Sequence, residues 1–269
     1  MGMSSVIMSK ATVQTAAKER ENGEEIFINL NAIAFLDSLR PLFAACPINL
    51  TIDSNNPAIL KSVVDNIWPM LNVGAMLLSE RILCGLRKSN SSILNSCPTL
   101  RVLCLYATDD FFTEFPADDS ASASDEKALA KWLFTPHPND VPKVLKCSIG
   151  RERFWKLKIV QFKTAFANAS SHANFIVVIC IPLCFVEPFE LINRIGEELT
   201  LKITADGENV LLIRCPIERD ASEWTKWEEE AIGWRISNQK NRIDVGIYDP
   251  ADVGDGLLKP APGPSVQQQ

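Results

Sequence analysis

Histidine is nearly absent from this sequence: only His137 and His172 occur among its 269 residues. A catalytic triad or a histidine-ligated metal site needs one of them beside suitable partners. His172 and Cys147 could form a base–nucleophile pair, but any chain with eight cysteines offers such a pair by chance. C-x-x-C motifs are missing, and Cys180 and Cys184 would lie about 13 Å apart in a strand, too far to bind one zinc ion. We therefore predict no catalytic residues and no metal ligands.

The glycine motifs that bind phosphates are missing as well. The sequence contains no G-x-G-x-x-G motif, no Walker loop and no G-x-S-x-G motif. Gly254 and Gly256 lie close together, but no predicted helix follows them to present backbone amides to a phosphate. We therefore predict that the chain binds no cofactor.

No apolar segment is long enough to span a membrane. The longest run, Phe175 to Val186, has about 12 residues, whereas a spanning helix needs about 20. The first twenty residues contain no apolar run of signal-peptide length. The eight cysteines are spread singly among apolar neighbours, which is typical of reduced thiols in a core. We expect a soluble protein of the cytoplasm or nucleus.

Positive charge is in deficit too. The chain has 27 Lys and Arg residues against 33 Asp and Glu residues, a formal net charge of −6. Domains that bind nucleic acid usually carry a basic face, so we predict no nucleic-acid partner. Because no apolar run is long enough to span a bilayer, we predict no membrane partner either. Acidic residues cluster at Asp118–Asp119 and at Glu228–Glu230, which we interpret as a solvated loop and a solvated helix face. We also expect a monomer.

The sequence does contain a series of strand-and-helix units. Leu100, Leu103 and Leu105 have the L-x-x-L-x-L spacing of a leucine-rich repeat, and the unit length of about 23 to 26 residues is within the period of such repeats. We therefore predict an α/β fold with irregular leucine-rich-repeat-like strand/helix units. An ordinary parallel α/β layer has connections of similar length and is the alternative. The predicted strands start near Ile26, Asn49, Gly74 and Thr99.

Four regions with different patterns follow one another along the chain. We predict a flexible leader over 1–23, a repeat-like α/β region over 24–142, a C-terminal α+β region over 143–252 and a disordered tail over 253–269. The boundary at 142 follows the proline-rich segment TPHPNDVP. Within the third region, two strand-like segments flank Asp206-Gly207, a turn signal that predicts a hairpin.

A Trp-rich helix is the most distinctive segment of the C-terminal region. Asp220 can cap its first turn, and Glu223 can complete a capping box. After this cap, Trp224, Trp227 and Trp234 fall on one helical face. A stripe of indole side chains covers a large apolar surface, so we expect this helix to pack on a sheet.

The order of residues around this helix resembles that of a known family. Two further segments fit the same family, Phe115 to Pro136 as a mid-chain linker with its helix and Ala173 to Leu201 as a pair of strands. Over about Asp65 to Leu258, the chain resembles the C-terminal, substrate-side part of the expanded F-box protein family of plant-parasitic cyst nematodes. The positions that match around the helix are Cys215 to Arg219, Trp224, Trp227, Glu228, Glu230, Ala231, Asn241 to Ile243 and Gly254 to Leu257.

The resemblance implies a function without catalysis. Members of that family begin with an F-box, a helical segment that docks onto the Skp adaptor of a cullin-RING ubiquitin ligase. No apolar helical segment able to form an F-box precedes the first predicted strand. The resemblance thus implies a protein-recognition domain, the substrate-binding part of an F-box-type ubiquitin-ligase adaptor. Its partner would be a protein substrate, with the Skp adaptor a partner only if a cryptic F-box exists.

Two alternatives to that function stay open. The chain could be an interaction module or competitor that binds the same targets without a ligase role. It could also be an enzyme of unrecognised type. The sequence assigns no partner-binding residues in any of these cases.

Overall fold

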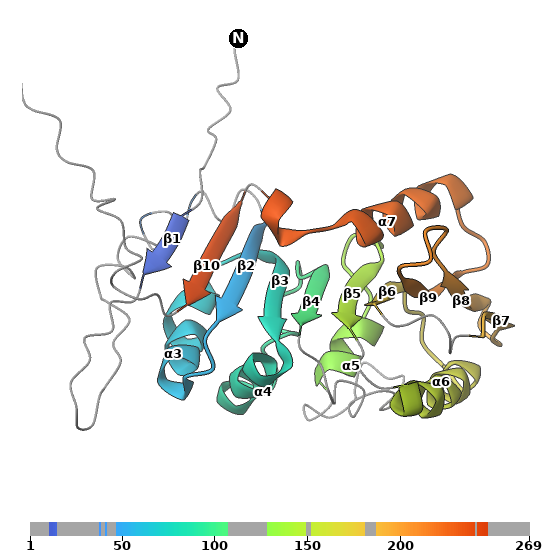
Figure 1. Cartoon of the computed structure of the whole chain (residues 1–269), viewed down its shortest axis with the longest axis horizontal. Coiled ribbons are helices and arrows are strands. Elements are labelled where there is room, and N and C mark those ends of the chain that lie inside the picture. Colours follow the sequence, from blue (N-terminus) through green and yellow to red (C-terminus); the bar gives the residue numbers. More distant parts are fainter. Residues whose placement is uncertain are drawn as a thin grey trace, which may run out of the picture.

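One ten-stranded sheet forms the centre of the structure (Figure 1). The computed structural model describes residues 11–14, 38, 41, 47–106, 128–148, 152–180, 187–239 and 241–246. The strands are β1 (Ala11–Gln14), β2 (Ile48–Asp53), β3 (Val73–Ser79), β4 (Val102–Tyr106), β5 (Lys143–Ser148), β6 (Phe175–Cys180), β7 (Phe189–Ile192), β8 (Glu197–Ile203), β9 (Val210–Pro216) and β10 (Arg242–Gly246). The main helices are α3 (Pro57–Ser62), α4 (Glu80–Ser89), α5 (Ala128–Phe134), α6 (Glu152–Ala167) and α7 (Ala221–Gly233). The protein is therefore mixed α/β, as predicted.

The strands lie in the order β1-β10-β2-β3-β4-β5-β6-β9-β8-β7 across the sheet. Pairs from β1 to β6 are parallel, whereas β6, β9, β8 and β7 pair in antiparallel fashion. From β2 to β6, neighbours in the sheet are also successive strands of the chain. After α7 the chain returns to the first strands, because β10 pairs with β2.

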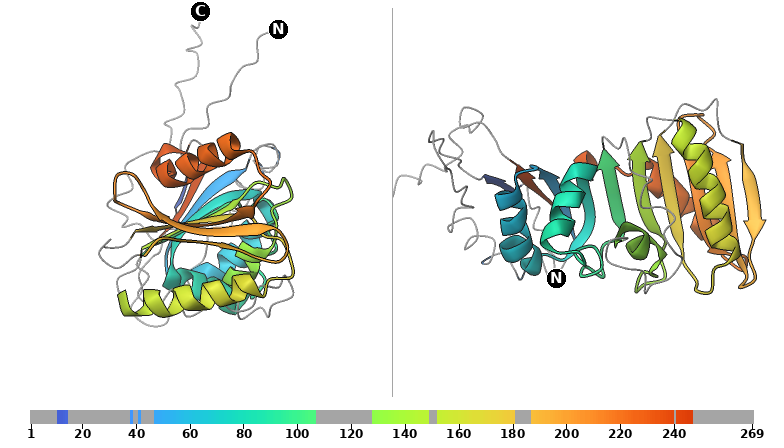
Figure 2. Two further views of the ribbon diagram at one scale, coloured as in Figure 1. Left: turned by 90° about the vertical axis from the view of Figure 1, so that its right-hand side faces the viewer. Right: turned by 90° about the horizontal axis from the view of Figure 1, so that it is seen from below.

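The helices divide unequally between the two faces of the sheet. Figure 2 shows α3, α4, α5 and α6 on one face, called the helix face below, and α7 on the other, called the α7 face. Parallel strands covered on both faces are expected to be apolar almost throughout. In β6, which reads FIVVIC, the first five residues are buried. The longest apolar run of the sequence thus begins with β6, a strand in the interior of the sheet.

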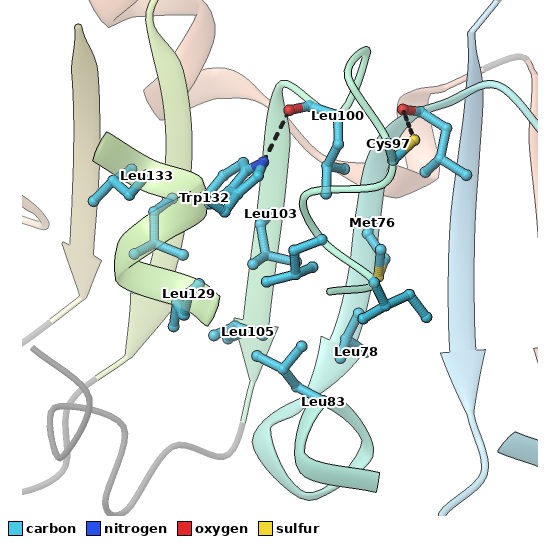
Figure 3. Packing of buried hydrophobic residues seen from close by; sticks show 14 of the residues in the cluster. Met76, Leu78, Leu83, Cys97, Leu100, Leu103, Leu105, Leu129, Trp132 and Leu133 are labelled. Carbon is cyan, nitrogen blue, oxygen red and sulfur yellow. Dashed lines mark hydrogen bonds between the residues drawn. The ribbon is translucent and has the colours of Figure 1, made fainter. Parts of the chain in front are cut away.

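The larger core lies on the helix face, between the sheet and the helices that cover it. Figure 3 shows Met76 of β3 and Leu103 of β4 among side chains from α4 and α5. Trp132 of α5 is fully buried, and its indole Nε1 donates a hydrogen bond to the Leu100 carbonyl oxygen at 3.1 Å. This bond satisfies the only polar group of the indole, so the ring adds apolar area without an unpaired donor.

Some elements differ from their predicted extent. The segment PAILKSVVDNIWPML (57–71), with Pro57 suited to a first turn, predicts one helix. After α3 it instead continues as a π-helix over Val63–Ile67 and a 3₁₀-helix over Trp68–Met70. Pro69 explains the change, because proline has no N–H to continue an α-helical ladder. The sequence predicts a helical or irregular segment over 81–97, and the structure has the end of α4 up to Ser89 with turns after it. The edge strand β7 was not predicted from pattern, since four residues are too few to show a period.

The predicted regions map onto the structure as follows. β1 lies within the segment predicted as a flexible leader and pairs with β10. The predicted boundary at 142 falls within one continuous sheet, because β4 pairs with β5 across it. The segment EIFINLN (25–31) predicts a strand, and AIAFLDSLRPLFAAC (32–46) predicts a helix broken or bent near Pro41. The predicted strand, almost all of that helix and the tail from 253 lie outside the described residues. No helix in the described part of the chain is both long and apolar enough to cross a membrane.

Two local predictions in the C-terminal region are confirmed. β8 and β9 form an antiparallel pair whose turn contains Gly207 at φ 72°, a conformation that favours glycine. α7 is capped by Asp220, whose carboxylate accepts hydrogen bonds from the backbone N–H groups of Ser222 at 2.8 Å and Glu223 at 3.1 Å. Local sequence signals are reliable here because each feature depends on a few adjacent residues.

The two tryptophans within α7 differ in burial. Trp224 is 6% exposed and packs on apolar side chains of β6 and β9. Trp227 is half-buried, and its ring makes an edge-to-face contact with Trp224 at 5.3 Å between centroids. Trp224 and Ala231 are the buried residues of α7, and Trp224 contributes the larger side chain to the contact with the sheet.

We expect Trp224→Ala to lower the free energy of unfolding by about 3–5 kcal/mol, because it removes a buried indole and leaves a cavity. Trp227→Ala serves as the matched control and should cost clearly less, because part of its ring is already in water. Urea denaturation monitored by circular dichroism gives both values. Equal losses in the two variants would contradict this packing.

Candidate functional site

A cavity of about 770 Å³ lies on the α7 face at the amino-terminal ends of β2, β3, β4 and β5. Three parts of the chain form it: the strand ends, the loop that precedes β5, and the connection from α7 to β10. We call the described residues of that connection, 234–239 and 241, the roof segment. The volume of the cavity lies within the range of roughly 300–1,000 Å³ that is usual for ligand pockets.

The floor of the cavity depends on a close approach of two strands. The pairing of β2 with β3 shifts register between Ile48 and Asn49. A Cβ atom on Gly74 would lie 2.6 Å from Cβ of Pro47, so a larger residue could not occupy this position without displacing the β2 end. Asn49 then connects floor to roof, because its Nδ2 donates to the Asn241 carbonyl oxygen at 3.0 Å.

The roof segment is fixed at its other end by a lysine. Lys146 projects from β5 on the α7 face, and its Nζ donates to the carbonyl oxygens of Ile232 at 2.7 Å and Trp234 at 2.9 Å. These carbonyls are at the carboxyl end of α7, where cations are favoured by the helix dipole. Burial lowers the pKa of Lys146. The lysine holds the indole-bearing Trp234 over the cavity.

Arg101 supplies positive charge at the cavity wall. Its Nε donates to the Pro142 carbonyl oxygen at 3.3 Å, which orients the guanidinium. Its Nη2 lies 3.4 Å from Oε2 of Glu230 on α7, in a pair whose side chains are 28% and 62% exposed. An ion pair this exposed and this long contributes little to the stability of the fold. Within the described part of the chain, Nη1 of Arg101 makes no hydrogen bond.

The loop before β5 presents a histidine and an asparagine to the cavity. Nδ1 of His137 accepts a hydrogen bond from the Asn139 backbone N–H at 3.2 Å, and the turn closes at Asp140 with φ 55°. Nε2 of His137 is buried and has no hydrogen-bond partner within the described residues. Burial, together with nearby positive charge, lowers the pKa of His137, so its imidazole is neutral at pH 7.

The lining can bind a ligand but is poorly equipped for chemistry. Among its described residues only Arg101 is charged, and none is acidic. Side-chain amides provide most of the remaining polar groups, and Val141 and Trp234 contribute apolar wall. These groups can donate and accept hydrogen bonds and pack against an apolar stem. Only His137 could transfer a proton near neutral pH.

The cysteine and histidine that the sequence offered as a pair are not together. Cys147 pairs with Ile179 near the carboxyl end of β6, whereas His172 precedes the amino end of that strand. Burial raises the pKa of Cys147, and it raises the pKa of Cys104 to about 12. Thiols with such pKa values are protonated at pH 7 and are weak nucleophiles. The described cysteines are free.

His172 instead lies beside a buried ion pair on the helix face. Glu197 and Arg214 are 0% and 1% exposed, with Nη2 to Oε2 at 2.6 Å. Oε1 of Glu197 accepts the Ala173 backbone N–H at 2.8 Å and lies 3.4 Å from Nδ1 of His172. Asn193 also donates to this carboxylate at 3.0 Å. With its oxygens occupied, Glu197 stabilises the fold rather than acting as a general base.

Neither metal ligation nor known relatives adds to this picture. No group of three or more His, Cys, Asp or Glu side chains in the described ranges is placed to hold a metal ion. Comparisons with protein-family models, with curated proteins and with solved structures find no match. The resemblance to F-box proteins therefore stays a prediction.

Lys143 is a second buried lysine near the cavity, on the helix face. It is 5% exposed, and its Nζ donates to the Trp132 carbonyl oxygen at 2.5 Å. Burial lowers the pKa of Lys143 from 10.5 to about 8. At pH values between about 8 and 10.5, Lys143 keeps its proton in the unfolded chain and has lost it in the folded chain. Folding stability from this group therefore rises with pH across that window.

We expect the free energy of unfolding of the wild type, relative to Lys143→Met, to increase by about 3 kcal/mol from pH 7.5 to pH 10.5. The thiols whose pKa values are raised titrate in both proteins, so their effect cancels in the difference. Urea denaturation at several pH values gives the two curves. A difference that stays constant across this range would show that Lys143 titrates as an ordinary surface lysine.

Proposed function

We propose that the chain is a non-catalytic protein-recognition domain that acts in the cytoplasm or nucleus and binds its partner at the cavity. The observation that carries the proposal is the composition of the cavity wall. Its arginine, amides and indole are groups that bind peptide segments, and its described lining includes no cysteine. The thiols of Cys104 and Cys147 lie outside the lining, and burial raises their pKa values. Arginine and tryptophan are also the residues that contribute most often to protein–protein binding energy.

The position of the cavity also favours recognition. In open α/β enzymes, the active site lies outside the carboxyl ends of the strands, where the strand order reverses. Here β2 to β6 run in chain order without such a reversal, and the cavity lies at the amino ends. The sheet adds strands in one direction from β2 to β6, with helices α3 to α6 on one face, and this order supports the proposal of irregular leucine-rich-repeat-like units. Proteins built from such units use the face opposite their helices for binding.

The role in ubiquitin transfer is proposed from the F-box resemblance. In that role the domain would hold a substrate near a separate catalytic subunit and raise its effective concentration there. The alternative is a competitor that binds the same targets without recruiting the ligase. Both roles need the same recognition surface, and they differ only in whether the protein also binds the Skp adaptor.

Site-specific cross-linking in cells tests the proposal. A photo-activated benzoylphenylalanine replaces Asn238 in the roof segment, and in a matched protein it replaces Val160, which is exposed on α6. We expect discrete protein adducts from position 238 that are missing at position 160. The purified adducts are then probed for the Skp adaptor, whose presence favours the ligase role and whose absence favours the competitor.

Equal adducts at both positions, or none at position 238, would contradict recognition at the cavity. A variant with Asn238→Ala verifies that the position tolerates replacement. Its melting temperature should match that of the wild type, because the Asn238 side chain is exposed.

A further inference from the structure

We propose that the cavity binds a single carboxylate carried by a peptide segment of the partner, with Arg101 as the anchor. This inference rests on the proposed recognition function and specifies its ligand. Arg101 is oriented by the Pro142 carbonyl, and its Nη1 makes no bond within the described residues. An arginine held in one orientation with a free nitrogen is suited to a planar carboxylate.

The protein's own α7 already brings a carboxylate to this arginine. Oε2 of Glu230 lies 3.4 Å from Nη2 of Arg101, at the long end of hydrogen-bond distance and in contact with water. The approach shows that the guanidinium is accessible to a carboxylate from the α7 face. A ligand carboxylate that enters the cavity can displace Glu230 at small cost, because exposed pairs contribute little.

Charge favours one carboxylate over a phosphate or a run of acidic residues. Arg101 gives the described lining a single positive charge, and burial keeps His137 neutral. The whole chain carries a net charge of −6, which repels ligands with several negative charges. One carboxylate balances one guanidinium and leaves no uncompensated charge in the cavity.

The remaining groups fit the peptide that carries the carboxylate. Asn139 and Asn241 line the cavity, and their side-chain amides make no hydrogen bond within the described ranges. An amide can both donate to and accept from a peptide backbone. Trp234 and Val141 provide the apolar surface for an aliphatic stem. The volume of about 770 Å³ has room for several peptide residues.

Fluorescence anisotropy of the full chain with labelled peptide pools tests the inference. The pools are ten residues long, blocked at both ends and randomised over neutral residues, with Glu, Gln or phosphoserine fixed at one central position. A Gln pool with a free carboxyl terminus separates a terminal carboxylate from a side-chain one. We expect a carboxylate-bearing pool to bind about ten-fold more tightly than the blocked Gln pool, as a charge-assisted hydrogen bond implies.

Variants assign the effect to the cavity. Arg101→Met should remove the preference for a carboxylate, while Arg81→Met, an exposed arginine of α4 on the helix face, should retain it. Glu230→Gln should tighten binding of the Glu pool by up to about five-fold, because it removes the internal competitor. That variant keeps the test valid if Arg101→Met fails to fold.

Three outcomes would overturn the inference: equal binding of the Glu and both Gln pools, tightest binding by the phosphoserine pool, or a carboxylate preference that persists in Arg101→Met. A lack of binding by every pool would overturn it as well. None of these outcomes decides the recognition function itself, since cross-linking at position 238 reports on that separately.

Discussion

Lys146 joins the end of α7 to the middle of the sheet, and the arrangement of the site depends on this contact. Its Nζ lies 2.7 Å from the Ile232 carbonyl oxygen and 2.9 Å from that of Trp234. Lys146 lies between Cys104 of β4 and Val178 of β6 in the sheet, both of which are buried. A lysine is costly to bury among such neighbours, and the lowered pKa of its ammonium reflects that cost. The two carbonyls at the negative end of the helix offset part of it.

The course of the chain after α7 follows from that anchor. Held at Trp234, the chain crosses the amino-terminal ends of β4 and β3 and enters β10, which pairs with β2. At the far side Asn49 binds the Asn241 carbonyl, so the roof segment is attached at both ends. The space enclosed below it is the cavity. Its lining therefore combines residues from the start, the middle and the end of the described chain.

Local features of this fold were predictable from the sequence, and the cavity was not. Asp220 as a cap and the Asp206-Gly207 turn depend on neighbouring residues, and both are found where predicted. The site depends on contacts such as that of Asn49 with Asn241, 192 residues apart, for which no local pattern exists. Arg101, just ahead of a strand, has the same sequence environment as an ordinary surface arginine. Sequence reasoning could therefore indicate the strands but not which of their ends would be covered.

Hydrogen–deuterium exchange in the roof segment tests the central claim most directly. The backbone amides of Asn238 and Gln239 are hydrogen-bonded within this segment at 3.1 Å each and serve as reporters. In Lys146→Met the account predicts that they exchange at least about ten-fold faster, because two bonds to a charged donor are lost. Lys202→Met, which removes the partner of Glu228 elsewhere on α7, should leave them unchanged. Unchanged exchange in Lys146→Met would contradict the account, because the roof would then be held by something other than Lys146.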